Sequence, residues 1–335
     1  MSAVSVQDAL VVLLCLAAAA VLKWRQWKAA YPDLVIEQIF LYPIKGLRPL
    51  SVQRAELAPL GFKYDRRFVL TSPAEDGSSA CHLAATYPSH ALLRQSIDYD
   101  SLTLTITAPS GESFTTPLQP STDGLVAAKV ELHQSPVVAY DLGDEAAGFF
   151  TTHSDGQATR LMYLDEAASA NRKVLGSMSD GKEKGIAFQD CASYMIASSA
   201  SLAAFSAALG RDMPILPLRP NIVVGPARSR GLEPWVEDFW AELRVAGKVT
   251  FRLTSNCVRC ISLNIDYATG KRLEGKGLPL QTLAKDRRVD SGSYSPVFGR
   301  YGFSNDVGNA VSVGDQVAVT KLNKERTVFR WPGMA

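Results

Sequence analysis

The chain has 335 residues, which is more than one small core usually organises and indicates about two lobes. Hydrophobic residues make up 47% of it and charged residues 20%, a composition that is typical of globular proteins and excludes a mainly disordered chain. The formal net charge of +2 provides no broad cationic surface, which disfavours nucleic acid as a main partner.

Residues 1–30 predict a membrane anchor with a basic flank. An uncharged run extends from Ala9 to Leu22, and three basic residues and two tryptophans follow it. This order is typical of the cytosolic end of a transmembrane helix, so the rest of the chain is expected to face the cytosol. A cleaved signal peptide and a buried core helix are the alternatives. The signal peptide is disfavoured because Asp8, and no basic residue, precedes the run.

Residues 31–150 are predicted to form a mainly β lobe. Runs that alternate apolar and polar residues, or are rich in β-branched residues, are separated here by Gly, Pro, Asp and Ser. The predicted strands span 35–44, 51–58, 66–72, 91–98 and 101–107.

Residues 151–335 are predicted to form a second lobe, with a soft boundary near residue 150. The hydrophobic period lengthens between Gly143 and Gly210, which predicts helices over 146–153, 164–175 and 198–209. Strand patterns then return at 221–225, 241–247, 249–255, 260–267 and 315–322. The predicted class is α+β, with two β-rich lobes and packed helices after an N-terminal transmembrane helix.

Cys257 and Cys260 form the only close pair among the five cysteines of the sequence. Structural zinc needs about four ligands, and the sequence has no second CxxC and no suitably spaced histidine pair. A thioredoxin-like pair would open a helix, whereas strand-type residues follow Cys260. Zinc and a redox pair stay as minor alternatives, and the two main interpretations are that the cysteines are small buried hydrophobes or include a thiolate ligand of a soft metal. Arg259 would favour the thiolate, although an arginine on a strand is usually a solvated surface residue.

Three basic motifs could bind an anion or a planar ligand. The RPN motif at 219–221 precedes an apolar strand, Lys45 precedes a glycine, and Arg66 begins an arginine pair. Each motif alone is equally compatible with a turn or an exposed ion pair. The sequence contains no GxGxxG, Walker, GxSxG or HExxH motif, so dinucleotide-binding, NTP-hydrolysing, hydrolase and zincin functions lose their usual support.

Taken in order, these segments resemble the MOSC family and, within it, the mitochondrial amidoxime-reducing components. The segments that carry the resemblance are YPIKG (42–46), DRRF (65–68), MIASSASL (195–202), RPNIVV (219–224), EDFWAEL (237–243), CVRCISLNIDYATG (257–270) and SPVFGRY (295–301). The resemblance implies an N-terminal β-barrel-like lobe followed by a MOSC β-barrel domain.

The resemblance also implies a molybdenum enzyme. Cys260 matches the cysteine that the family uses as the protein ligand of molybdenum, and a thiolate is a soft donor suited to that metal. Positions that resemble the family's contacts to the pterin and phosphate of the molybdenum cofactor, Mo-molybdopterin, are Lys45, Arg66, Ser198, Arg219 and Asn221. The implied reaction is a two-electron reduction of N-hydroxylated small molecules of the amidoxime or hydroxylamine type. Electrons would come from NADH through cytochrome b5 reductase and cytochrome b5. The family implies the outer mitochondrial membrane, and the anchor alone fits the endoplasmic reticulum equally.

Three departures from the family pattern concern the cofactor and substrate pocket. Leu83–Thr86 stand where relatives usually have a TARQ-like segment with an arginine, Gly46 stands where serine is usual, and an insertion lengthens 228–235. One alternative function is a non-catalytic MOSC module that carries or transfers molybdenum cofactor or sulfur. A second is a membrane-tethered binding module without metal, in which both cysteines are buried filler.

Overall fold

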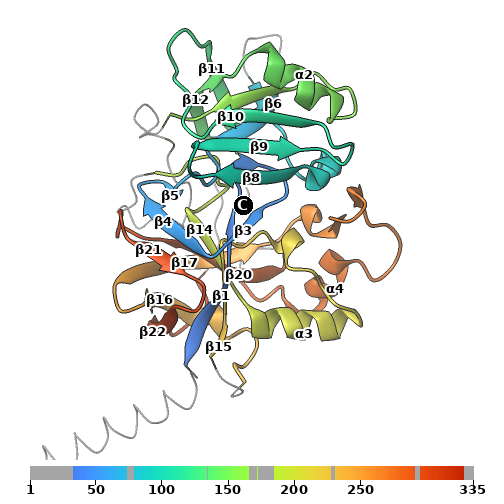
Figure 1. The fold of residues 1–335 in the computed structure, drawn as a ribbon. Helices are drawn as coiled ribbons and strands as arrows, with labels where there is room; N and C mark the ends of the chain where they lie inside the picture. Colours follow the sequence, from blue (N-terminus) through green and yellow to red (C-terminus); the bar gives the residue numbers. More distant parts are fainter. Residues whose placement is uncertain are drawn as a thin grey trace, which may run out of the picture.

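The structure is a computed structural model of the chain and describes residues 33–73, 79–133, 135–165, 172, 185–227, 231–290 and 295–327. Two β-rich lobes with short helices lie one above the other in Figure 1, which confirms this part of the predicted class. The predicted anchor at 1–30 lies outside the described residues. Among the residues that are described, no helix is long and apolar enough to cross a bilayer.

The lower lobe in Figure 1 is built on an eight-stranded sheet. The strand order is β15-β14-β20-β17-β16-β22-β1-β3, and a further pairing of β1 with β15 closes the sheet into a barrel. Its strands are β1 (Leu34–Leu41), β3 (Leu50–Val52), β14 (Tyr194–Ser198), β15 (Ile222–Pro226), β16 (Trp240–Val245), β17 (Val249–Val258), β20 (Val297–Phe303) and β22 (Gln316–Leu322). The strand β1 therefore shares a sheet with strands of the C-terminal half of the chain.

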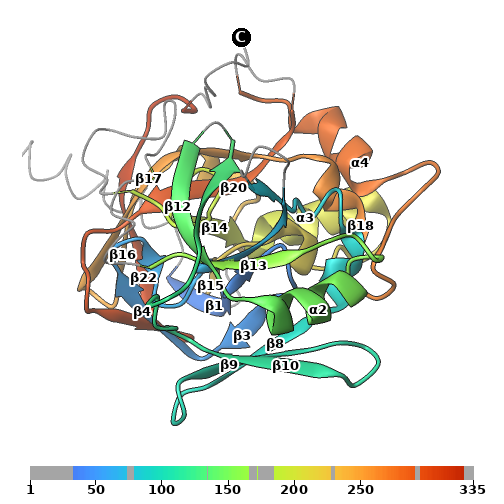
Figure 2. The same ribbon diagram turned by 90° about the horizontal axis from the view of Figure 1, so that it is seen from above.

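The upper lobe contains a six-stranded sheet in the order β13-β12-β11-β7-β6-β2, which a pairing of β13 with β6 closes. A three-stranded sheet, β10-β9-β8, lies beside it, as seen from above in Figure 2. These strands are β2 (Ile44–Lys45), β6 (Phe68–Pro73), β7 (Ser79–Cys81), β8 (Arg94–Asp98), β9 (Thr103–Thr107), β10 (Ser113–Pro117), β11 (Ala127–Leu132), β12 (Ser135–Asp141) and β13 (Arg160–Tyr163). Two small sheets complete the fold, β21-β4-β5 (Ala310–Ser312, Arg54–Ala58, Gly61–Phe62) and β18-β19 (Ile265–Asp266, Lys271–Arg272).

Two predicted helices are confirmed, α2 (Asp144–Thr152) and α3 (Ser199–Leu209). The hydroxyl of Ser198 accepts a hydrogen bond from the backbone N–H of Ser201 at 3.4 Å, and Gly210 ends α3 in the left-handed conformation. The helix predicted over 164–175 lies mostly outside the described residues. The sequence pattern missed α4 (Pro279–Asp286). The 3-10 helices in the described part of the chain are η1 (Pro88–Leu92), η3 (Leu216–Leu218), η4 (Val236–Phe239) and η5 (Ile261–Asn264).

The strand predicted over 260–267 is wrong. The chain leaves the barrel after Val258, turns through η5, and forms only the two-residue strand β18. The apolar residues that suggested a strand are nevertheless buried, since Leu263 packs in a cluster with residues of α3 and α4 and Ile265 packs beside η1. An alternating pattern indicates that one side of a segment is buried. In this segment a turn, and not a strand in a sheet, buries the apolar side chains.

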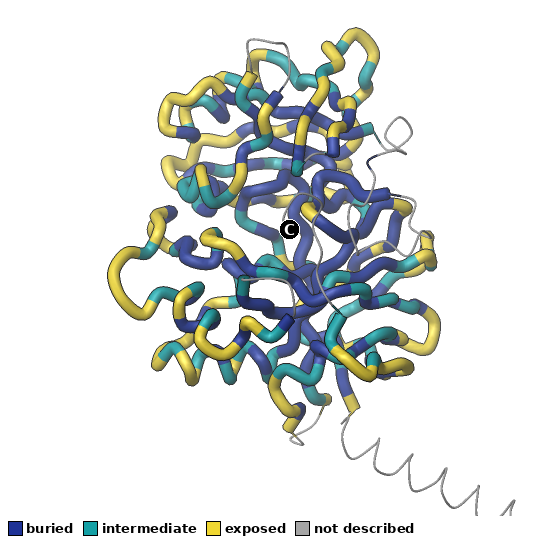
Figure 3. The backbone as a smooth tube through the Cα atoms, turned by 180° about the vertical axis from the view of Figure 1, so that it is seen from behind, coloured by how far each residue is buried: buried dark blue, intermediate teal, exposed yellow. Residues whose placement is uncertain are grey.

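The buried residues lie along the interior segments of both lobes (Figure 3). The lower barrel buries Ile36, Trp240 and Phe251 in one cluster. Backbone packing is tightest at Gly299 of β20, whose φ is +74° and where an added Cβ would lie 2.7 Å from the carbonyl oxygen of Ile196. Only glycine fits both restraints. The strand β20 can therefore lie directly against β14, whose residue Met195 faces the pocket described below.

His82, Tyr87 and His90 form an aromatic stack. The rings of His82 and Tyr87 are stacked at 3.7 Å, and those of Tyr87 and His90 at 5.2 Å. The Nε2 atom of each histidine lies 2.8 Å from a serine hydroxyl. Burial lowers the pKa of His82 to about 4 and, with the neighbouring His82, that of His90 to about 3.

The free energy of unfolding is expected to fall as the pH drops below about 6.5, because both histidines stay neutral in the fold and take up protons when unfolded. The stabilisation from the neutral histidines is fully present above their unfolded pKa of about 6.5. It is lost as the pH falls from there to their folded pKa values, and it amounts to a few kcal/mol. Burial raises the pKa of Glu237 to about 7, which contributes with the opposite sign. Thermal unfolding of wild type and His90→Gln between pH 7.5 and 4.5 isolates the histidine. Equal pH slopes would contradict the assignment.

Candidate functional site

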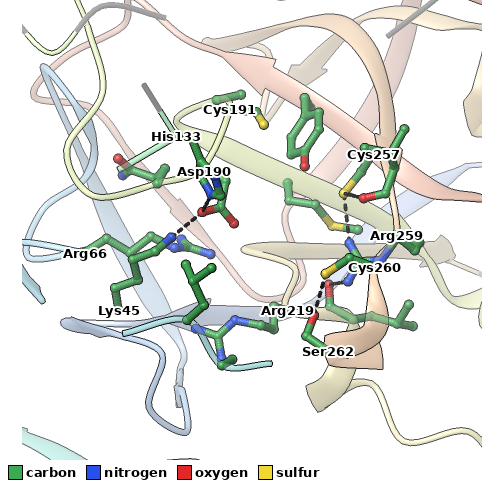
Figure 4. Close-up of a pocket in the computed structure, with 18 of the residues that line it drawn as sticks. Lys45, Arg66, His133, Asp190, Cys191, Arg219, Cys257, Arg259, Cys260 and Ser262 are labelled. Carbon is green, nitrogen blue, oxygen red and sulfur yellow. Dashed lines mark hydrogen bonds and ion pairs between the residues drawn. The ribbon is translucent and has the colours of Figure 1, made fainter. Parts of the chain in front are cut away.

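A pocket opens between the two lobes and is lined by residues of both (Figure 4). The predicted residues Lys45, Arg66, Arg219, Asn221 and Cys260 all line it. These residues lie far apart in the sequence, so the pocket exists only because the lobes pack together.

Ser198 does not line the pocket. Its side chain is fully buried and its hydroxyl caps α3, where the first turn of a helix has backbone N–H groups without partners inside the helix. The structure therefore gives Ser198 a local capping role, and a contact of this residue with the cofactor stays a prediction.

Cys260 is exposed and lines the pocket directly after β17. Its sulfur lies 3.1 Å from the hydroxyl of Ser262. Cys260 also occupies the position before η5, so the backbone turns sharply there and presents the thiol at the surface of the pocket. An accessible thiol at a turn is available to a soft metal ion.

Cys257 has a different environment. It is only 2% exposed, and a guanidinium nitrogen of Arg259 lies 2.8 Å from its sulfur. The same guanidinium donates to the carbonyl oxygen of Leu218 at 2.9 Å. The expectation of a solvated Arg259 is therefore wrong, because this side chain ties the cysteine loop to the turn that carries Arg219. Burial by itself would lower the pKa of Arg259. The nearby Cys257 outweighs this effect, so the pKa of Arg259 is raised.

Within the RPN motif, the side-chain amide of Asn221 makes hydrogen bonds to several other segments of the chain. Its Oδ1 accepts hydrogen bonds from Arg66 and from the backbone N–H of Met195, both at 3.2 Å. Its Nδ2 donates to Asp65 at 3.2 Å and to the carbonyl oxygen of Phe40 at 3.3 Å. The amide is therefore saturated by the protein and orients Arg66 rather than offering free donors to a ligand.

Arg66 and Arg219 are held on one ring. Their guanidinium carbons lie 4.3 and 4.6 Å from the centroid of Tyr42, which is fully buried and donates its hydroxyl to the carbonyl oxygen of Pro220 at 2.8 Å. Both arginines have a left-handed backbone, with φ of 53°. The ring stabilises two like charges side by side, and Asp65 compensates part of that charge, because its Oδ2 lies 2.5 Å from a guanidinium nitrogen of Arg66.

Replacing Tyr42 with leucine is expected to weaken anion binding by about tenfold, because each cation–π contact contributes on the order of 1 kcal/mol. Tyr42→Phe keeps the ring and should keep most of the affinity. Calorimetric titration of the metal-free protein with inorganic pyrophosphate measures the effect, and thermal unfolding controls for stability. Equal affinities for the two variants would show that the ring does not position the arginines.

On the side of the pocket opposite Cys257 and Cys260 in Figure 4, Lys45 and His133 converge on Asp190. The ammonium of Lys45 and Nε2 of His133 both contact Oδ1 of Asp190, the latter at 3.0 Å. Burial raises the pKa of Asp190, but Lys45 and His133 outweigh it and hold this pKa well below its usual range. Sequence reasoning missed Tyr42, His133 and Asp190, and no motif spacing marks the last two.

The first-lobe departures lie in the pocket wall. Leu83, Ala84 and Ala85 line the pocket together with Gly46. Arg272 of β19 donates to the carbonyl oxygen of Ala85, so a cation from the other lobe braces this wall from outside. Of the lengthened segment, residues 228–230 are outside the described part of the chain, and 231–235 do not line the pocket.

Two family models match most of the chain. A model of the MOSC N-terminal beta barrel domain matches residues 33–154, and a model of the MOSC domain matches residues 183–318. Mitochondrial amidoxime reducing component 2 of Bos taurus is 31% identical over 297 residues, which cover 84% of this chain and 82% of the relative. The chain belongs to the MOSC family.

Other members of the family match over similar lengths. Mitochondrial amidoxime-reducing component 1 of Homo sapiens is 27% identical over 309 residues, which cover 87% of each chain. The component 2 of Rattus norvegicus is 29% identical over 294 residues, which cover 84% of this chain and 82% of the relative. The resemblance to the MOSC family, which the ordered motifs indicated, is thus confirmed.

The donor set of the pocket fits an anionic metal cofactor. It offers one exposed thiol and three cationic side chains, Lys45, Arg66 and Arg219, of which Lys45 pairs with Asp190 and Arg66 with Asp65. Among the described residues no group of three or more His, Cys, Asp and Glu side chains could hold a metal ion by itself. A cofactor that brings its own metal ligands and its own negative charge matches this arrangement, since the protein supplies a single soft ligand and the counter-charges.

Proposed function

We propose that this protein is a molybdenum-cofactor-dependent oxidoreductase that reduces N-hydroxylated compounds of the amidoxime or hydroxylamine type. The observation that carries the proposal is the exposed thiol of Cys260 in an inter-lobe pocket with three cations, in a chain related over most of its length to proteins named amidoxime-reducing components.

Cys260 would hold molybdenum through its sulfur, and Lys45, Arg66 and Arg219 would bind the negatively charged groups of the pterin cofactor. When bound, the cofactor supplies the two-electron redox chemistry, while the protein positions it and the substrate. Asn221 and Tyr42 orient the arginines, and Arg259 fixes the loop of Cys260 against the turn before Arg219. These groups would set the position of the metal relative to an incoming substrate.

The electrons would come from NADH through cytochrome b5 reductase and cytochrome b5. The relatives are named as mitochondrial components, which supports a mitochondrial location for this chain. We further propose that residues 1–30 anchor it in the outer mitochondrial membrane, with the pocket on the cytosolic side. An anchor would hold the enzyme and its electron donors at one surface, which raises their effective concentration.

The test is reconstitution of the full chain with molybdenum cofactor, NADH, cytochrome b5 reductase, cytochrome b5 and an aromatic amidoxime. The expected result is formation of the amidine and water with equimolar NADH oxidation. Omission of cytochrome b5 is the control and should stop turnover. A protein that holds molybdenum but produces no amidine would contradict the proposal and favour a non-catalytic module that carries the cofactor or transfers sulfur.

A further inference from the structure

A second cavity lies between the two lobes, apart from the pocket of Cys260. It is a groove of about 830 Å³, and none of the residues that line it also lines the pocket. Small-molecule sites have volumes on the order of 300 to 1,000 Å³, so the groove is large enough for a ligand. The upper lobe contributes β8 and the turn after β9, and the lower lobe contributes the segment after β18.

Arg48 is held in a defined orientation on the groove wall. Its Nε donates to the carbonyl oxygen of Ala91 at 2.9 Å, and its Nη2 donates to the carbonyl oxygen of Tyr267. Its guanidinium carbon also lies 5.6 Å from the centroid of the Tyr267 ring. Its Nη1 makes no hydrogen bond to any residue that the structure describes. An arginine that is oriented in advance loses less conformational entropy when it binds a ligand.

A second guanidinium lies close to that of Arg48. Arg94 is on the exposed side of β8 and lines the same groove. Burial lowers the pKa of Arg48, and the positive charge of Arg94 lowers it further, because the two cations repel each other. Neither arginine forms an ion pair with a carboxylate of the described ranges. An anion between the two side chains would replace this repulsion with charge-assisted hydrogen bonds.

The acidic side chain on the groove wall, Asp266, already has partners of its own. Its Oδ1 accepts from the backbone N–H of Ala268 at 2.8 Å, and its Oδ2 accepts from the hydroxyl of Thr269 at 2.8 Å. These hydrogen bonds lower the pKa of Asp266 and close the turn between β18 and β19. The carboxylate therefore stabilises its own turn and leaves the charge of the arginine pair uncompensated.

The side chains of the groove favour a ligand with two negative charges and an apolar body. A guanidinium binds phosphate or carboxylate oxygens through two parallel hydrogen bonds. A phosphate monoester approaches a charge of about −2 above its second pKa of about 6, which matches two arginines better than the single charge of a carboxylate. Leu92, Pro109 and Pro214 also line the groove and provide an apolar wall.

We propose that this groove binds a small phosphate monoester, with the phosphate between Arg48 and Arg94 and the ester group on the apolar wall. Arg48 donates to the phosphate from Nη1, which is free of other described partners, and Arg94 donates to it from β8. Because the groove is separate from the pocket of Cys260, this binding site does not depend on the proposed reduction.

The groove adjoins the cofactor pocket through one aromatic residue. Arg219 of the pocket donates to the hydroxyl of Tyr267 at 2.9 Å and to the carbonyl oxygen of Leu47 at 3.1 Å. Tyr267 therefore contacts Arg219 at its hydroxyl, and Arg48 at its ring and its backbone carbonyl. No residue lines both cavities, so substitutions can distinguish an anion in the groove from an anion in the pocket.

The test is calorimetric titration of the metal-free full chain with phenyl phosphate at about pH 7.5, where this ester is a dianion. Arg94→Gln is the main variant, because its exposed side chain has no hydrogen bond to a described residue and its loss should leave the fold intact. The expected result is saturable binding to wild type and an affinity at least about tenfold lower in the variant. Arg48→Gln should lose at least as much, and thermal unfolding checks that it stays folded.

Two other arginines serve as controls. Arg244→Gln is the matched control, since Arg244 is also exposed on a strand, β16, but lies outside the groove. Arg66→Gln removes a cation of the cofactor pocket. Both variants should keep the wild-type affinity for phenyl phosphate. A loss in Arg66→Gln without a loss in Arg94→Gln would place the anion in the cofactor pocket and overturn the proposal.

Two further ligands test the chemistry of the site. Benzoate has the same ring with a single charge, and inorganic phosphate has the charge without the ring, so each should bind more weakly than phenyl phosphate. Benzoate binding as tightly as phenyl phosphate would refute the preference for a dianion. No binding of phenyl phosphate to wild type, or an equal loss in Arg94→Gln and Arg244→Gln, would exclude the site itself.

Discussion

Replacement of Cys260 with serine is expected to abolish molybdenum binding. Serine keeps the size of the side chain but replaces a soft thiolate with a hard hydroxyl, and the described part of the pocket offers no cluster of other metal-binding side chains. Metal analysis of the purified protein should show about one molybdenum per chain in wild type and less than about a tenth of that in the variant. Amidoxime reduction should be lost in parallel.

Cys257→Ser is the matched control, because it changes the same atom three residues away. Cys257 is buried against Arg259 and does not present its sulfur as Cys260 does. We expect this variant to keep the metal and to lose some thermal stability. Retention of molybdenum by Cys260→Ser would refute the assignment of the ligand, and loss of the metal from both variants would point to a general disturbance of the loop.

The largest effect on stability is expected from Asp238→Asn. Asp238 is fully buried, and its carboxylate accepts from Arg287 at 2.7 and 2.9 Å and from Arg326 at 2.9 Å. Arg300 donates to its backbone carbonyl oxygen at 2.9 Å. Removal of the negative charge breaks the ion pair with the buried guanidinium of Arg287, which costs about 3 to 5 kcal/mol.

Urea unfolding measures this change, and Glu56→Gln provides the control. Glu56 pairs with Lys63 at 3.7 Å on the surface, where both side chains are exposed, so its loss should change the free energy of unfolding by less than about 1 kcal/mol. The unfolding midpoint of Asp238→Asn should therefore fall far below that of Glu56→Gln. Similar midpoints would mean that the arginines find other partners when the charge is removed.

The local elements were predictable because their determinants are local. The helix α3 has a serine cap at one end and a glycine at the other, and β17 alternates buried and half-buried residues along its length. The same reasoning failed at 260–267, where the apolar spacing suits a strand but no neighbouring strand continues past Val258. A strand needs a partner for its backbone hydrogen bonds, and that partner is not encoded in the segment itself.

The candidate site was predictable only in part. The family resemblance directed attention to Cys260 and to the basic residues, and five of the six predicted residues line one pocket. Ser198 matched a motif but points to the start of its own helix. For Arg259 the sequence suggested a surface position, because most arginines are exposed. This average does not account for a particular buried partner.

By itself, the sequence determined the α+β class, most strand and helix positions, and membership of the family. Tertiary structure decided which side chains meet. The closure of the barrels brings Arg66 and Arg219 onto the ring of Tyr42, although they belong to segments about 150 residues apart, and it places His133 against Asp190. Hydrophobic period and capping depend on neighbours a few residues away, whereas the charge and shape of this pocket depend on contacts between distant segments.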